Sequence, residues 1–170
     1  MFIQMIAKLF SIKFFGHLVS KYVNGFHGID STLQNGMVIN STNCMTVVET
    51  LNLMSWNCKG VMSAVPYLND CLQKFDVHIC ALSEHWLRQC NIHFLQQINT
   101  NYIAYSKSVD ELSPDAQKWK NYRKGVALLV HQDFDKYVVN EISIDCERII
   151  GVELCLPCSS RLFIFLLHNR

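Results

Sequence analysis

The side chains best placed to do chemistry are an amide and a carboxylate that each follow an apolar run of the chain. Asn57 closes the stretch LNLMSWN, and Glu84 lies two positions beyond the run VHICAL at residues 77–82. An amide both donates and accepts hydrogen bonds, whereas an ionised carboxylate only accepts them. Polar groups at the ends of buried-looking segments indicate that the fold delivers them to a ligand site.

The elements that must position this pair are a strand, a helix and a second strand. Residues 51–56 are apolar enough for a strand buried on both faces, and Pro66 suits a first helical turn. Apolar residues then follow at the spacing of one helical face: Leu68, Cys71, Leu72 and Phe75. Residues 77–82 form the second strand. A crossover of this kind makes the strands parallel, so we expect the amide and the carboxylate at the same edge of an α/β sheet.

A second candidate site is a basic and aromatic segment between residues 107 and 124. Basic side chains pair with phosphates and aromatic faces stack on bases, so this segment is suited to gripping a DNA strand. The candidate contacts are Lys118, Trp119, Lys120, Tyr122 and Arg123. The alternative is a solvated loop between two strands, since Asp110, Glu111 and Asp115 partly offset the charge.

Length and composition are typical of one folded domain. A chain of 170 residues can bury roughly 70% of the surface that it exposes when unfolded. Hydrophobic residues make up 50% and charged residues 17%, which argues against disorder. The net charge of +1 gives no global field toward nucleic acid or an anionic membrane, so any such partner must meet a local patch.

The chain contains eight cysteines, an even number that would indicate disulfides in a short secreted protein. Cys71 and Cys80, however, lie inside apolar runs, where a reduced cysteine behaves as a small hydrophobe. We therefore predict a reducing, intracellular compartment, either the nucleus or the cytoplasm. Cys155 and Cys158 have CxxC spacing, but zinc would need further ligands, and Pro157 favours a turn between two strands.

Residues 1–50 differ from the rest of the chain. The segment begins with a crowded apolar run that Lys8 and Lys13 interrupt, without an acidic residue nearby. This order of features fits neither a secretory signal nor a mitochondrial presequence, and the run is short for a membrane span. Residues 24–50 are rich in Gly, Asn, Ser and Thr, as in a linker. We assign residues 1–50 to an apolar leader and a polar linker of unknown role, and expect no membrane contact by residues 1–15.

Three short motifs carry a family resemblance. SWNCKG at residues 55–60 and ALSEHWL at residues 81–87 flank the predicted helix, and KGVALLV follows at residues 124–130. In this order they resemble the endonuclease/exonuclease/phosphatase superfamily, most closely the apurinic-like endonuclease domains of non-LTR (LINE-type) retrotransposons. The resemblance covers residues 51–170, about the amino-terminal half of such a domain. It implies a partial two-layer α/β sandwich and cleavage of phosphodiester bonds in DNA with Mg²⁺, or with Mn²⁺ in its place.

The resemblance also implies roles for individual residues. Glu84 matches the family's metal-binding glutamate and Asn57 its strand-end asparagine, so both are expected to be catalytic and to hold the metal. Phosphodiester hydrolysis builds negative charge that a cation must offset, and Mg²⁺ needs only one or two carboxylates because it keeps several waters. His85 is expected at the rim of the site. His168 stands where the family has a tyrosine, and so departs from the pattern.

Other motifs of the family are not found before Arg170. A GDxN-like loop and an SDH-like stretch are missing from the sequence, so we expect this chain alone to have weak activity or none. One alternative is a non-catalytic remnant that at most binds nucleic acid. Another is a sugar- or lipid-phosphate phosphatase of the same superfamily. Strands that would pair with a second half lack partners, so we also expect self-association through the apolar residues 162–167.

Overall fold

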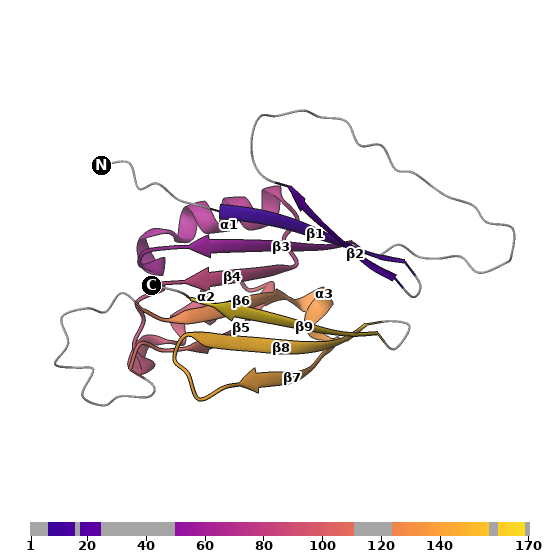
Figure 1. Ribbon diagram of the computed structural model, residues 1–170. Coiled ribbons are helices and arrows are strands. Elements are labelled where there is room, and N and C mark those ends of the chain that lie inside the picture. Colours follow the sequence, from indigo (N-terminus) through magenta and orange to yellow (C-terminus); the bar gives the residue numbers. More distant parts are fainter. Residues whose placement is uncertain (1–6, 16–17, 25–49, 111–123, 157–159, 169–170) are drawn as a thin grey trace, which may run out of the picture.

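The computed structural model describes residues 7–15, 18–24, 50–110, 124–156 and 160–168 (Figure 1). In the first two of these ranges only the backbone is described. Within this part of the chain, the secondary structure is a mixture of helices and strands, and the strands form two sheets. The predicted α/β class is therefore confirmed.

The larger sheet contains six of the described strands, in the order β2-β1-β3-β4-β6-β5. Its strands are β1 (Ala7–Phe15), β2 (Leu18–Asn24), β3 (Thr50–Asn57), β4 (Ile79–Ser83), β5 (Tyr102–Lys107) and β6 (Val126–His131). β3 and β4 pair in parallel, and the other neighbours in this sheet are antiparallel. The parallel pair lies in the middle of the sheet, where both strands are protected by neighbours.

The strand–helix–strand unit forms as the sequence predicts. After β3, the short 3₁₀ helix η1 (Val61–Ser63) leads into α1 (Val65–Lys74), which has Pro66 in its first turn. The residues of α1 at the predicted spacing are buried: Leu68, Cys71 and Leu72. Asp76 then takes a positive φ of 45°, and this turn directs the chain into β4. The parallel pairing of β3 and β4 follows from this crossover.

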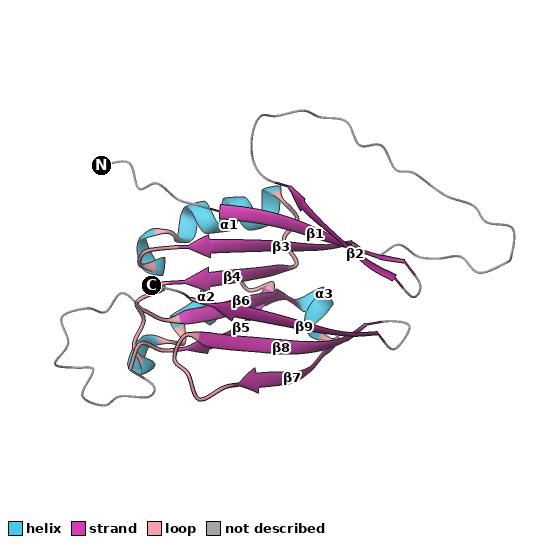
Figure 2. Cartoon of the chain, viewed as in Figure 1, coloured by secondary structure: helices cyan, strands magenta, loops and turns pink. Residues whose placement is uncertain are grey.

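Helices cover one face of the six-stranded sheet (Figure 2). The 3₁₀ helix η2 (Gln89–Asn91) and the helix α2 (Phe94–Gln97) follow β4, and Leu95 of α2 joins the same apolar cluster as α1. Strand residues of this cluster include Met54, Trp56, Cys80 and Leu129. Alternate side chains of β3 therefore point to this helical side, as expected for an extended strand.

The opposite face packs against the smaller sheet. Three described strands form that sheet in the order β7-β8-β9, namely β7 (Val138–Ser143), β8 (Ile149–Leu156) and β9 (Ser160–Leu167). The short helix α3 (Gln132–Asp135) connects β6 to β7. A second apolar cluster fills the space between the sheets, with members such as Leu51, Ile79, Leu128, Ile150, Val152 and Leu154. This shared core fixes the position of the smaller sheet relative to the ends of β3 and β4.

Residues 7–24 form a hairpin that extends the larger sheet. β1 pairs with β2 and also with β3, so that Ala7 lies opposite Trp56 and Lys13 opposite Thr50. The sequence did not predict this pairing, and the role of residues 1–50 stays a prediction. The helices among the described residues all fall short of the length and apolar character that a membrane span requires.

Candidate functional site

Asn57 and Glu84 meet at the carboxyl end of the parallel strand pair. Asn57 lies opposite Ser83 in the β3–β4 register, and Glu84 is the next residue along the chain. The Asn57 Nδ2 atom donates a hydrogen bond of 2.8 Å to Oε1 of Glu84. The predicted meeting of the amide and the carboxylate at one edge of the sheet is confirmed.

The Asn57 amide is oriented by hydrogen bonds on both of its ends. While its nitrogen faces Glu84, its Oδ1 atom accepts a hydrogen bond of 3.3 Å from the backbone N–H of Lys59. This turn-type contact is common for an asparagine at the end of a strand. In this arrangement Asn57 positions the carboxylate of Glu84, and its own oxygen faces the backbone.

The backbone at the site is held in a conformation that non-glycine residues rarely adopt. Glu84 has a φ of 57° and Trp86 a φ of 62°. Such residues cost of order 1–3 kcal/mol each and cluster at functional sites. Hydrogen bonds from the neighbouring loop hold the strained turn: Gly60 N–H donates to Glu84 O at 2.9 Å, and Cys58 N–H donates to Ser83 O at 3.0 Å.

Two glycines make room for the rings on either side of this turn. An added Cβ atom at Gly60 would lie 2.8 Å from Cε3 of the Trp86 ring. At Gly125 it would lie 2.3 Å from Cε1 of the His85 ring. The two Lys-Gly pairs of the motifs, at residues 59–60 and 124–125, therefore frame the loop that carries Glu84.

His85 is a structural residue of the interior. Its side chain is buried, with the residue 1% exposed, so the expected position at the rim of the site is wrong. Its Nδ1 atom accepts a hydrogen bond of 3.0 Å from Leu87 N–H, and its Nε2 atom lies 3.0 Å from the carbonyl oxygen of Lys107. With Nδ1 as an acceptor, Nε2 carries the proton and donates. Burial lowers the pKa of His85 to about 4, so the ring is neutral at pH 7.

The smaller sheet contributes His168 to the site. The Nε2 atom of His168 lies 3.7 Å from Oε1 of Glu84, and the two side chains are only 14% and 19% exposed. The backbone N–H of His168 donates to Arg148 O at 3.1 Å, which fixes the residue just beyond β9. The sequence singled out His168 as a departure from the family pattern but could not place it beside Glu84, because the contact depends on how the two sheets pack.

Two lysines tie the loop between β7 and β8 to this end of the molecule. Lys107 donates through Nζ to the carbonyl oxygens of Ile144 and Cys146, the latter at 3.3 Å. Lys124 forms an ion pair with Glu147. Both lysines flank the basic segment that is predicted to contact DNA. Each ammonium group, however, already has partners within the fold.

The residues predicted to bind DNA lie outside the described residues. These are Lys118, Trp119, Lys120, Tyr122 and Arg123, and their role stays a prediction. Cys158 of the CxxC pair is likewise outside, while Cys155 is exposed and free. Cys71 and Cys80 are buried free thiols, as predicted, and burial raises the pKa of Cys80 well above its ordinary value.

The side chains at the strand ends include three kinds of group that can contact a cation or its water shell. Glu84 supplies a carboxylate, and an imidazole and an amide lie within contact of it. Mg²⁺ typically uses one or two carboxylates together with substrate phosphates. Among the described residues, no group of three or more His, Cys, Asp or Glu side chains is arranged to hold a metal ion.

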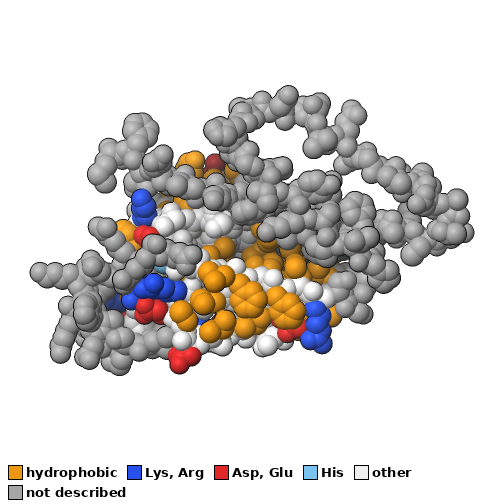
Figure 3. Space-filling model, viewed as in Figure 1, with side chains coloured by type: hydrophobic (Ala, Val, Ile, Leu, Met, Phe, Trp, Pro, Cys, Tyr) orange, Lys and Arg blue, Asp and Glu red, His pale blue; other side chains and the backbone are white. Residues whose placement is uncertain are grey.

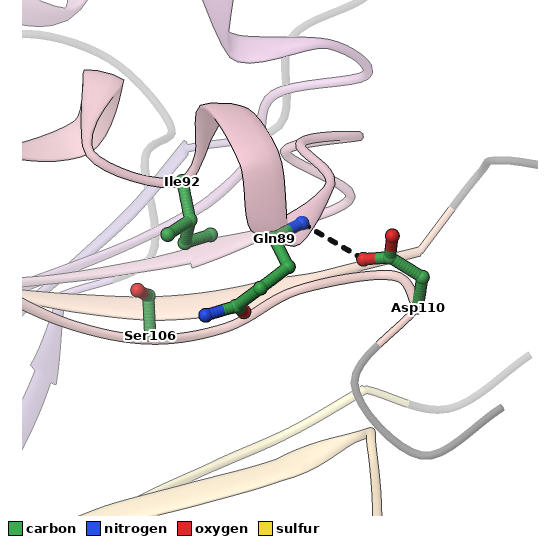
Figure 4. Close-up of a pocket in the computed structure, with 4 residues that line it drawn as sticks. All are labelled: Gln89, Ile92, Ser106 and Asp110. Atoms are coloured by element: carbon green, nitrogen blue, oxygen red, sulfur yellow. Dashed lines mark hydrogen bonds between the residues drawn. The ribbon is translucent and has the colours of Figure 1, made fainter. Parts of the chain in front are cut away.

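A pocket of about 280 Å³ lies elsewhere on the surface, lined by Gln89, Ile92, Ser106 and Asp110 (Figure 4). The Asp110 carboxylate accepts a hydrogen bond of 2.8 Å from the backbone N–H of Gln89. None of the site residues at the strand ends lines this pocket. Its one acidic group already caps a backbone donor, so the strand-end cluster remains the better candidate site.

No protein-family model matches this chain, and no curated protein matches it in sequence. The family resemblance of the three motifs therefore stays a prediction.

Proposed function

We propose that the Asn57–Glu84 pair belongs to the metal site of a phosphodiesterase that nicks DNA, as in the endonucleases of retroelements. The observation that carries this proposal is the 2.8 Å hydrogen bond between the two side chains, at the carboxyl ends of adjacent parallel strands. Open sheets tend to bind ligands at such an edge. The strained φ of Glu84 adds support, because the fold maintains it at a cost in stability.

The arrangement of the sheets supports the same proposal. Helices α1 and α2 cover the outer face of the larger sheet, and the inner faces of both sheets share one core. This is the layering expected for a partial endonuclease/exonuclease/phosphatase-like sandwich, which we propose as the specific fold. The motifs SWNCKG, ALSEHWL and KGVALLV all meet around Glu84 in three dimensions, through the contacts of Gly60 and Gly125 with the two rings.

The chemistry of the site follows from the positions of its side chains. Mg²⁺, when bound, would offset the negative charge that builds on the phosphate oxygens during hydrolysis. The Glu84 carboxylate would hold the ion, and Asn57 would keep that carboxylate in one orientation through its amide N–H. Because Glu84 is only 19% exposed, little bulk water competes for its oxygens.

A plasmid-nicking assay tests this proposal. Supercoiled DNA is incubated with the full chain and Mg²⁺, and the rate of relaxation is compared between the wild type and Glu84→Gln. We expect only weak nicking by the wild type, and nicking no faster than in a protein-free blank for Glu84→Gln, since the substitution removes the charge that holds the cation. Glu141→Gln is the matched control, because Glu141 is an exposed carboxylate on β7 of the other sheet.

The same assay separates the alternatives. Equal nicking by the wild type and Glu84→Gln would contradict the proposed nuclease function of this site. DNA binding without any Mg²⁺-dependent nicking would favour a non-catalytic fragment. Release of inorganic phosphate from a sugar or lipid phosphate, lost in Glu84→Gln, would instead assign the site to a phosphatase.

A further inference from the structure

His168 and Glu84 face one another across a gap that is too wide for a hydrogen bond. Their closest atoms, Nε2 and Oε1, are 3.7 Å apart, whereas hydrogen bonds of this type measure about 2.7–3.2 Å. The two side chains come from different sheets and are largely buried. The fold therefore brings a nitrogen donor and an oxygen donor together without joining them directly.

This gap is slightly wider than the separation of two ligands on one metal ion. Donor atoms about 2.1 Å from an ion lie about 3.0 Å apart at a right angle and about 3.4 Å apart at the tetrahedral angle. A shift of about 0.3–0.7 Å, within reach of a small side-chain rotation, would let His168 and Glu84 share an ion. Backbone hydrogen bonds at Arg148 and at Gly60 already fix the two residues near these positions.

We propose that His168 is a nitrogen ligand of the divalent ion at Glu84, and that it makes the site prefer Mn²⁺ to Mg²⁺. This inference rests on the proposed function, because it concerns the same metal site. Imidazole suits transition metals better than Mg²⁺, and among those metals Mn²⁺ is the one that also favours oxygen ligands, so a site with one imidazole beside a carboxylate suits Mn²⁺. The Asn57 oxygen accepts a hydrogen bond of 3.3 Å from Lys59 N–H and has a second lone pair, so the expected role of Asn57 as an oxygen ligand stays a prediction beside this one.

The alternative is a simple ion pair between a protonated His168 and Glu84, with no part in metal binding. Electron paramagnetic resonance of Mn²⁺ distinguishes the two, since it reports both the free ion and the nitrogen nuclei close to the bound ion. The full chain is titrated with Mn²⁺ alone as wild type, His168→Gln, Glu84→Gln and His93→Gln. His93 is the matched control, because it is an exposed histidine at the start of α2.

We expect the electron spin echo of bound Mn²⁺ to be modulated by a ¹⁴N nucleus in the wild type and in His93→Gln. This modulation should be lost in His168→Gln. The Mn²⁺ affinity of His168→Gln should fall by about tenfold or more, while Mg²⁺ affinity, measured by competition, stays within about twofold of the wild type. Urea unfolding of His168→Gln, and of His168→Asn as a second variant, checks that the fold is kept.

The outcomes separate this inference from the proposed function. Bound Mn²⁺ without nitrogen modulation, or unchanged Mn²⁺ affinity in a folded His168→Gln, overturns the role of His168. If Glu84→Gln still abolishes binding and nicking in that case, the proposed function stands. Mn²⁺ binding that survives in Glu84→Gln overturns both, because the ion then binds elsewhere.

Discussion

One glycine next to the larger sheet and one within the smaller sheet lie against an aromatic ring, and the surroundings of the two contacts differ. Just before β6 of the larger sheet, a Cβ atom at Gly125 would lie 2.3 Å from the ring of His85. In the smaller sheet, a Cβ atom at Gly151 would lie 2.6 Å from the ring of Phe165. His85 is 1% exposed and hydrogen-bonded, whereas Phe165 is 43% exposed. The two rings therefore differ in their freedom to move.

The difference reflects how the sheets are covered. The outer face of the larger sheet is buried under α1 and α2, and its loops hold the strained turn at Glu84. Figure 3 shows apolar side chains gathered on the molecular surface over β8 and β9. On β9 the exposed ones are Phe163, Phe165 and Leu167. Covering a sheet confines its side chains enough to build a site, whereas an open face leaves them free to rearrange or to bind a partner.

The largest effect is expected for Gly125→Ala. The residue has a φ of 96°, a conformation that strains any side chain, and the new methyl group would collide with the confined His85 ring. We expect the free energy of unfolding to fall by about 3 kcal/mol or more. Urea denaturation followed by circular dichroism measures this loss.

A double-mutant cycle isolates the ring contact. In a His85→Ala background the ring is absent, so Gly125→Ala should cost only the backbone strain, about 1–2 kcal/mol. The same cost of Gly125→Ala in both backgrounds would contradict the proposed contact between the methyl group and the ring.

The next largest effect is a loss of stability in acid that depends on His85. Burial lowers the pKa of His85 from 6.5 to about 4. As the pH falls from 6.5 to about 4, the imidazole of His85 binds a proton in the unfolded state but not in the folded state. The free energy of unfolding therefore falls with the pH. The loss should total about 3 kcal/mol between pH 7.5 and pH 4, with no contribution from His85 above pH 7.5.

Urea unfolding at several pH values measures this slope in the wild type and in His85→Gln. The glutamine cannot gain a charge, so the variant should lack this part of the pH dependence. Burial also lowers the pKa of His78, but that residue is present in both proteins and its contribution cancels. Parallel curves for the two proteins would contradict the assignment to His85.

The contact between Asn57 and Glu84 could be predicted from the sequence because it depends on a local unit. One strand, one helix with a regular apolar face and a second strand bring the two strand ends together. The burial of His85 could not be predicted, since it depends on Gly125, which is 40 positions away. The sequence feature that could have indicated it is the Lys-Gly pair, which occurs at residues 59–60 and again at residues 124–125. The approach of His168 was also beyond prediction, because the packing of two sheets determines it.

A smaller effect is expected for Gly151→Ala. The methyl group would lie 2.6 Å from the Phe165 ring, which is exposed enough to swing toward solvent, and 3.1 Å from the backbone oxygen of Ile164, which needs only a small shift. Because Gly151 lacks a positive φ, the alanine also stiffens the unfolded chain, which offsets part of the cost. We expect a net loss of about 1 kcal/mol or less in urea denaturation. A loss as large as that of Gly125→Ala would show that the Phe165 ring is as confined as that of His85.

The smallest effect on stability, with a large effect on association, is expected for the double substitution Phe163→Thr with Leu167→Thr. Both side chains lie on the exposed face of β9, which is an edge strand among the described strands of its sheet. Threonine suits a strand, so the free energy of unfolding should change by no more than about 0.5 kcal/mol.

An open edge beside an apolar face favours pairing with another chain, so we propose self-association of the wild type through β9. Sedimentation velocity at increasing protein concentration should show association of the wild type and less of it in the double variant. Met62→Thr is the matched control, because Met62 is 55% exposed in η1, a helix that follows β3 of the other sheet. Equal association of all three proteins would place the contact elsewhere. Loss of association in Met62→Thr alone would place the contact between chains at the larger sheet, which carries the site. That result would contradict the distinction between a covered sheet and an open sheet.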